Sequence, residues 1–134
     1  MAKFPTDEWL VELKVKLNKD ERYARIAQTW EGDMMVIIEA GGNLIESKKV
    51  YLDLWHGKCR SATFLEGPNE PSAAVSLTLP YENGVKLLGG ELEVMQALLT
   101  RKIGVKGNMA LLMRNVPTVL DFVRCCKEIT DSFI

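Results

Sequence analysis

A histidine and a cysteine lie three residues apart at His56 and Cys59, which is the one place where the sequence sets a base beside a nucleophile. Such a pair could serve as a cysteine nucleophile with its general base, or as two ligands of a metal ion. His56 is the sole histidine, so a metal site would need Asp53 or distant cysteines to complete its three or four ligands. No oxyanion-stabilising element can be named nearby. The spacing therefore favours a hairpin turn with a structural histidine over either kind of chemistry.

Two further patterns resemble reactive or phosphate-binding motifs. Cys125 and Cys126 are adjacent, and neighbouring cysteines rarely bridge each other without strain, so we expect one buried and one incidental thiol. Gly89-Gly90 and Gly104-x-x-Gly107 match neither the loop G-x-x-x-x-G-K-[ST] nor a strand-to-helix G-x-G-x-x-G. These glycines predict turns and close packing.

The composition is that of one ordinary globular domain spanning residues 1–134. The 134 residues are 47% hydrophobic and 26% charged, with a net charge of -1 and no basic stripe, so nucleic acid is not an expected partner. Three cysteines do not fit a secreted disulfide framework. The chain shows neither a signal peptide nor an apolar run of about 18 residues, so we expect a cytoplasmic protein.

The elements that must position these residues begin with a helix capped by Thr6, whose residues Trp9, Leu10, Leu13 and Leu17 fall within one quadrant. A second short helix is expected at 23–30. From Met34 the period changes to two. Strands are predicted at 34–38, 50–55, 59–65 and 73–79, with Gly41-Gly42-Asn43 in the first hairpin and the last strand apolar on one face.

The C-terminal half predicts helices on either side of a fifth strand. A loop at 67–71 precedes the fourth strand, and short helices are expected at 82–88 and 91–101 around Gly89-Gly90. A fifth strand at 103–113 follows from the apolar residues Ile103, Val105, Met109, Leu111 and Met113. Asn115 caps a final helix with Pro117 in its first turn and an apolar face formed by Val116, Val119, Leu120, Val123 and Cys126. One α+β layer structure, a sheet covered by helices, is the simplest closure.

Four stretches carry a resemblance to a known family. They are Thr-Trp-Glu-Gly at 29–32, Leu-Asp-Leu-Trp-His-Gly-Lys-Cys at 52–59, Leu-Leu-Gly-Gly-Glu-Leu-Glu-Val-Met-Gln-Ala at 87–97, and Ile-Gly-Val-Lys-Gly-Asn-Met-Ala at 103–110. With them the chain resembles the sterol carrier protein two (SCP-2), or nonspecific lipid-transfer, family from Phe4 to Ile129. The hairpin at 52–59 looks most like stand-alone prokaryotic members, and the C-terminal Ser-Phe-Ile is not a peroxisomal address.

The resemblance implies an SCP2-like fold: a five-stranded, mostly antiparallel sheet covered by helices, with an apolar ligand cavity between them. It implies binding, and transfer or presentation, of fatty acids, acyl-coenzyme A, sterols or similar lipids, with no reaction, metal or cofactor. By the face on which each lies, the lining is expected to consist of Trp30, Met95, Leu98, Leu99, Val105, Met109, Leu111, Met113, Val119, Phe122 and Val123.

A charged head group would prefer a cation at the cavity mouth, and the nearby candidates are Arg101, Lys102, Lys106, Arg114 and Arg124. Taken one by one, the apolar residues read first as ordinary core and the cations as solvated charges. A second function therefore stays open, namely a non-catalytic helper module that docks to a lipid-metabolising enzyme or to its own copy as a homodimer. Transient contact with a membrane or an enzyme fits either function.

Overall fold

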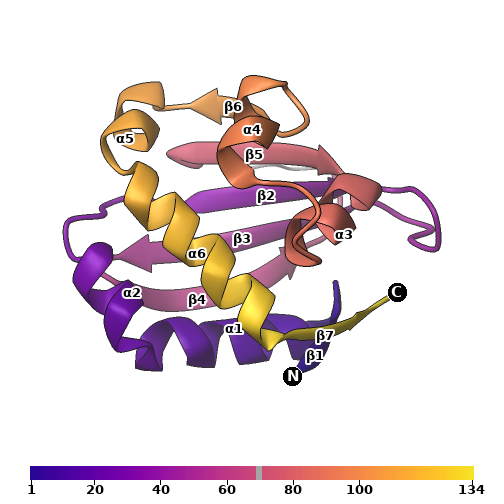
Figure 1. The fold of residues 1–134 in the computed structure, drawn as a ribbon, viewed down its shortest axis with the longest axis horizontal. Helices are drawn as coiled ribbons and strands as arrows, with labels where there is room; N and C mark the ends of the chain where they lie inside the picture. Colours follow the sequence, from indigo (N-terminus) through magenta and orange to yellow (C-terminus); the bar gives the residue numbers. More distant parts are fainter. Residues whose placement is uncertain (69–70) are drawn as a thin grey trace.

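The computed structural model describes residues 1–68 and 71–134, so part of the loop predicted at 67–71 lies outside the described residues (Figure 1). The first helix is the expected one, α1 (Asp7–Lys19). The Thr6 hydroxyl accepts a hydrogen bond from the Trp9 amide at 3.2 Å, which satisfies a free donor of the first turn. All four residues of the predicted apolar face are buried. Periodicity and capping thus agreed on this element.

A shorter helix, α2 (Glu21–Ile26), follows directly because Asp20 both ends α1 and caps α2. Its carboxylate accepts a hydrogen bond from the Tyr23 amide at 2.8 Å. The helix ends four residues before Trp30, earlier than the predicted boundary. A negative side chain at the start of a helix is favourable because the free amides there carry partial positive charge.

Five strands form the main sheet: β2 (Met34–Glu39), β3 (Lys48–Trp55), β4 (Lys58–Leu65), β5 (Val75–Pro80) and β6 (Gly104–Gly107). Their order is β4-β3-β2-β5-β6. The hairpins β2–β3 and β3–β4 are antiparallel, as is β5–β6, while β5 pairs parallel to β2. The sheet is therefore five-stranded and mostly antiparallel, as expected.

The register of the sheet collects apolar side chains on one face. Val36 lies opposite both Val50 on β3 and Leu77 on β5. Leu52 and Leu79, two residues further along β3 and β5, lie on the same face. The alternate residues on β3 and β5, such as Tyr51 and Thr78, point to the opposite face and are only partly buried. The predicted alternation of β5 is confirmed, and one face of the sheet needs a covering layer.

Helices supply that layer (Figure 1). Helix α6 (Val116–Ile129) crosses the front of the sheet, and α1 runs beside β4. Helices α3 (Tyr81–Leu88) and α4 (Val94–Leu99) lie on the side of α6 opposite α1. The short strands β1 (Ala2–Phe4) and β7 (Thr130–Phe133) pair in parallel next to α1. This pairing of the two ends gave no sequence signal, because each strand has only three or four residues.

The fifth predicted strand is wrong beyond Gly107. Strand β6 ends there, and Met109–Arg114 forms a helix, α5. Gly107 has a φ of +106°, and a Cβ at this position would lie 2.3 Å from the Ala74 carbonyl oxygen, so the strand ends in a turn that only glycine permits. Asn108 then caps α5 by accepting from the Leu111 amide at 2.9 Å. Cap and turn override the apparent alternation.

Among the described residues no helix is both long and apolar enough to cross a lipid bilayer.

Candidate functional site

An apolar cavity of about 80 Å³ lies between the inner face of the sheet and its covering helices. Strands β2, β3 and β5 form its floor, and α1, α3, α4 and α6 supply the walls. The described residues present no polar surface to it. Such a cavity cannot bind an ion or a sugar, because a polar ligand would lose its bonds to water without replacement. It can take a hydrocarbon chain.

Four of the residues predicted as lining meet at this cavity. Leu98 contributes from α4, and Val119, Phe122 and Val123 contribute from consecutive turns of α6. The three α6 residues lie on the face of that helix that turns toward the sheet, whereas Leu120, predicted on the apolar face of the same helix, is exposed.

The other predicted residues lie outside the lining. Leu99, Met109 and Met113 are exposed, with 80%, 48% and 64% of their surfaces accessible to water. The two methionines were assigned inward as strand residues, and their helix α5 turns them outward. Trp30 is fully buried in the core, donates from Nε1 to the Gly32 carbonyl at 2.8 Å, and does not line the cavity. The remaining predicted residues are partly buried and also lie outside the lining; they are Met95, Val105 and Leu111.

Most of the lining was missed by the sequence analysis. The inner sheet face contributes pairs of alternating residues on three strands, and the signal that could have found them is the same period of two that predicted the strands. The residues concerned on β2, β3 and β5 are Val36, Ile38, Val50, Leu52, Leu77 and Leu79. Others come from the helices, the N-terminal strand and the loop before β6, namely Phe4, Trp9, Leu13, Gly84, Leu87, Leu88, Val94, Ile103 and Cys126.

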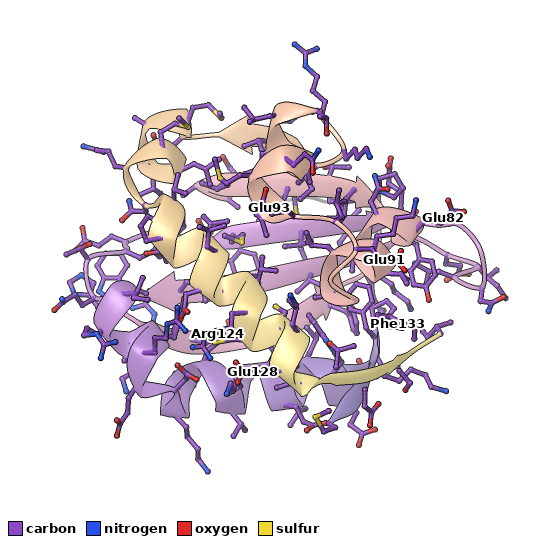
Figure 2. All side chains as sticks on the ribbon, in the orientation of Figure 1. Glu82, Glu91, Glu93, Arg124, Glu128 and Phe133 are labelled. Carbon is purple, nitrogen blue, oxygen red and sulfur yellow. The ribbon has the colours of Figure 1, made fainter. Side chains whose placement is uncertain are left out.

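A groove of about 390 Å³ lies on the outer side of the same wall, between α6 and the α3–α4 connection. Leu87, Val94 and Val123 line both the groove and the cavity, so these three side chains lie between the two spaces. The groove rim is charged: Figure 2 shows Glu93 at the start of α4 and Arg124 and Glu128 on α6. A modest shift of the wall would open the cavity into the groove.

Lys127 is the cation of this rim that the sequence analysis missed. It extends from α6 toward the glycine turn after α3, and its Nζ lies 4.0 Å from the place of a Cβ on Gly90. No carboxylate of the described residues lies within 4 Å of its amine. Arg101, Lys102, Lys106 and Arg114, which were expected at the mouth, lie outside the groove.

The profile of the SCP-2 sterol transfer family matches residues 13–119. The chain belongs to this family. A crystal structure of sterol carrier protein 2 is 30% identical and superimposes with a TM-score of 0.83, covering 92% of this chain and 96% of the other. The solution structure of a conserved hypothetical protein of Thermus thermophilus, described as possibly a sterol carrier protein, is 29% identical, with a TM-score of 0.82 and 95% and 90% coverage.

A third similar structure is that of palmitated SCP2L2 from Aedes aegypti, 18% identical with a TM-score of 0.61 over 88% of this chain and 94% of that one. At this identity it shares the fold alone. No curated protein sequence gives a significant match. Membership in the SCP-2 family establishes lipid binding or transfer as the general function and leaves the ligand open.

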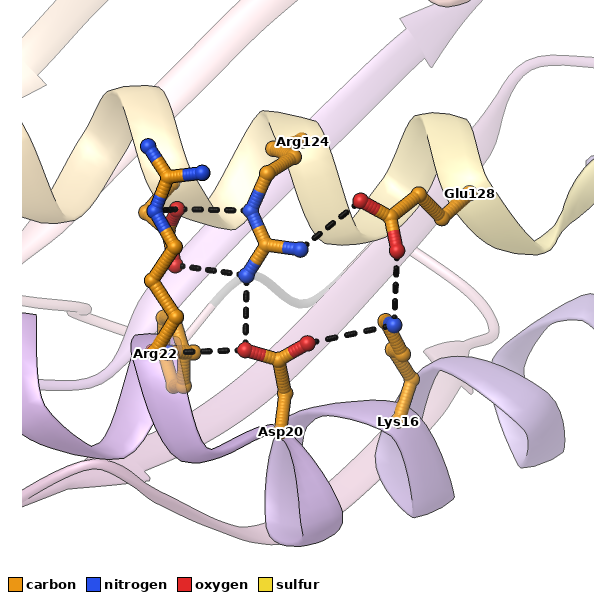
Figure 3. A network of polar contacts seen from close by, with 7 residues as sticks. Lys16, Asp20, Arg22, Arg124 and Glu128 are labelled. Atoms are coloured by element: carbon orange, nitrogen blue, oxygen red, sulfur yellow. Dashed lines mark hydrogen bonds and ion pairs between the residues drawn. The ribbon is translucent and has the colours of Figure 1, made fainter.

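Arg124 of this SCP-2 family member is held by carboxylates on three sides (Figure 3). Its guanidinium donates to Asp121 at 2.7 and 3.0 Å, to Asp20 at 2.6 Å and to Glu128 at 2.7 Å. Lys16 bridges Asp20 and Glu128 at 3.1 and 2.8 Å. The guanidinium lowers the pKa of Asp20 well below its usual range. Arg124, predicted as a head-group cation, is therefore fully engaged in joining α6 to α1 and α2.

His56 and Cys59 do not form a catalytic pair in the SCP-2 fold. His56 and Gly57, with φ angles of +50° and +79°, form the two-residue turn of the β3–β4 hairpin. The His56 ring stacks on Trp55, and its Nε2 lies 2.5 Å from Glu31 Oε2. Burial raises the pKa of the Cys59 thiol to about 11, which leaves it un-ionised. The structural role expected for this histidine fits these contacts.

Cys125 and Cys126 are both buried, which corrects the expectation of one incidental thiol. Burial raises the pKa of Cys125 to about 11 and that of Cys126 well above its usual value. Asp20, Asp121 and Cys125 place their ligand atoms within 4.8 Å of one another, a spacing that a metal would accept. The two carboxylates are already paired with Arg124, Lys16 and Arg22, however, so this cluster supports structure.

Proposed function

We propose that this protein binds a single-chain lipid, such as a fatty acid or the acyl chain of acyl-coenzyme A, in the cavity and carries or presents it without catalysing a reaction. The observation that supports this proposal is the wholly apolar lining between the sheet and α6. Every side chain that faces the cavity is apolar, and the ionisable thiol among them, Cys126, is neutral. The described residues that line the cavity therefore offer neither an ionised nucleophile nor a base.

Burial alone provides the affinity that such a carrier needs. Each buried methylene contributes about 0.8 kcal/mol, so the roughly 14 methylenes of a palmitoyl chain contribute about 11 kcal/mol. Association costs at least about 4 kcal/mol, which leaves about 7 kcal/mol and a Kd on the order of 10 µM. A polar anchor would add to this affinity and is not required for it.

The size of the cavity favours a flexible chain over a rigid ring system. Pockets for drug-sized ligands measure roughly 300–1,000 Å³, and this cavity measures about 80 Å³. The groove beyond Leu87, Val94 and Val123 adds about 390 Å³, so displacing those three side chains would create sufficient length for an acyl chain. A sterol would have to widen the whole layer at once, whereas a chain can enter one methylene at a time.

Lys127 is the group that we expect to meet the ligand head. It stands at the rim of the groove without a partner carboxylate among the described residues, and Arg124 beside it is saturated. A carboxylate or phosphate that projects from the opened wall would reach this ammonium group and still contact water.

The small volume also favours the alternative, a helper module with a filled interior that docks to an enzyme or to its own copy. Native mass spectrometry of the purified protein, compared with its denatured mass, separates the two functions. The carrier function predicts co-purified lipid, or stoichiometric micromolar binding of a fluorescent fatty acid that palmitate displaces. If fatty acids, acyl-coenzyme A and sterols all fail to bind, the helper function replaces it.

A pair of neighbouring leucines provides the matched control. Leu98 faces the cavity and Leu99 faces water. The substitution Leu98→Trp would fill the cavity, and we expect it to weaken fatty-acid binding at least tenfold. Leu99→Trp should leave binding within twofold. Equal effects of the two substitutions would contradict the placement of the ligand in this cavity.

A further inference from the structure

The charges of this chain are segregated along the sequence. From Val94 to Leu120 there are four cations, Arg101, Lys102, Lys106 and Arg114, and no aspartate or glutamate. The whole chain has 17 basic and 18 acidic residues, and all 18 acidic residues lie outside this stretch. A near-zero net charge thus conceals one strongly basic segment.

The fold gathers this segment at one end of the molecule. It forms α4, the edge strand β6 and α5, which lie together along the rim of the sheet (Figure 1). All four cations are exposed, and none forms an ion pair with a carboxylate of the described residues. Their field is therefore directed into solvent without internal compensation.

Large apolar side chains project from the same end. Leu99, Met109 and Met113 are 80%, 48% and 64% exposed, and they are interspersed along the chain with the four cations. Exposed valines also occur on α1, at Val11 and Val15, but the first turn of that helix is acidic. The α4–β6–α5 end joins three exposed long apolar side chains to four unpaired cations in a stretch of the chain that has no acidic residue.

We propose that the α4–β6–α5 end docks on the surface of anionic lipid bilayers. The four cations would contact lipid phosphates while Leu99, Met109 and Met113 enter the boundary between head groups and acyl chains. Protein–protein interfaces are depleted of lysine at their cores, and here two lysines lie among the apolar residues, which favours a lipid surface. Docking would also place α4, whose Leu98 lines the cavity, directly against the membrane.

Sedimentation with phosphatidylcholine vesicles, with and without phosphatidylserine, tests this surface. Each cation near an anionic surface is worth about a fivefold change in partitioning. The expected result is strong binding to the phosphatidylserine vesicles, weakened at least a hundredfold in a variant with glutamine at all four cationic positions. The substitutions Leu99→Ser, Met109→Ser and Met113→Ser together should weaken binding about tenfold.

The control removes the same charge elsewhere. Glutamine in place of four exposed cations near the opposite edge of the sheet should weaken binding less than fivefold; these positions are Lys3, Lys14, Lys19 and Arg25. Failure of the unmodified protein to bind either vesicle would overturn the proposal, as would a control that loses as much binding as the α4–β6–α5 variant. Fatty-acid titration of each variant is a separate readout, so a failed docking surface and a failed cavity are distinguishable.

Discussion

The two sides of α6 differ in what fills the space beside them. Toward α1 and α2, Arg124 makes short bonds to Asp20 of the α1–α2 junction and to Asp121 and Glu128 of its own helix, and Tyr23 and Cys125 are buried. Toward the sheet, Val119 and Phe122 line a cavity without any polar contact. One helix therefore has a bonded side and an unbonded side.

This difference indicates which layer moves when a ligand enters. Charged hydrogen bonds are directional, so α6 keeps its place relative to α1 and α2. Apolar contacts are non-directional and permit displacement at a small cost. Helix α4 is six residues long, buries only Val94 and Ala97, and follows the glycine turn at Gly90. We therefore expect α4, with the end of α3, to move away from α6.

Removing the Arg124 ion pairs should have the largest effect on stability. The substitution Arg124→Met leaves Asp20 and the buried Asp121 without their main partner, so we expect the free energy of unfolding to fall by about 3 kcal/mol. Urea denaturation measures this change. Lys127→Met on the same helix is the control, because Lys127 is exposed, and it should cost less than about 0.5 kcal/mol. A similar loss in both variants would contradict the comparison.

Acid should reversibly weaken the ion pairs that Arg124 and Lys16 form with Asp20 and Glu128. Arg124 and Lys16 lower the pKa values of Asp20 and Glu128, so these carboxylates bind protons more weakly in the folded than in the unfolded chain. Their contribution is complete at neutral pH and is lost as the pH falls below the ordinary values of 3.8 and 4.5. We expect a loss of about 2 kcal/mol from about pH 6 to pH 2, measured by urea denaturation. Arg124→Met should flatten this dependence; an unchanged slope would refute it.

Hydrogen exchange sharpens the comparison without a mutation. Because the unbonded side opens first, the amides of α4 should exchange faster than those of α1, and saturating palmitate should slow them about tenfold. The amides of α1 should change less than twofold. Mass spectrometry of peptides from the two helices measures both, and uniform slowing of the two helices would indicate that the ligand stabilises the whole chain instead.

The smallest expected effect concerns the head group. Lys127→Gln should weaken palmitate binding three- to fivefold, since an exposed ion pair contributes up to about 1 kcal/mol. Binding of hexadecanol, which lacks the carboxylate, should not change. Displacement of a fluorescent fatty acid by each compound gives the two affinities, and equal losses for both ligands would show that Lys127 acts through packing.

Local patterns were sufficient for most elements of the fold. The cap at Thr6 and the apolar quadrant of α1 are contained within a dozen residues, as is the alternation of β5, so the chain specifies them before any tertiary contact forms. A similar alternation at 103–113 wrongly predicts a strand at Met109 and Met113, because the turn at Gly107 depends on the approach of the Ala74 carbonyl, 33 positions earlier in the sequence. A contact of that range leaves no periodic signal.

The sequence by itself determined the family and the α+β class, and it placed Val119 and Val123 on the inward face of α6. Only the tertiary structure decided which residues line the cavity, because four strands and four helices from distant parts of the chain meet there. It also decided the roles of the cations. Arg124 and Lys127 are three residues apart on one helix, and Asp20 from the α1–α2 junction, with Asp121 and Glu128 of α6 itself, engages Arg124 and leaves Lys127 as the cation at the rim.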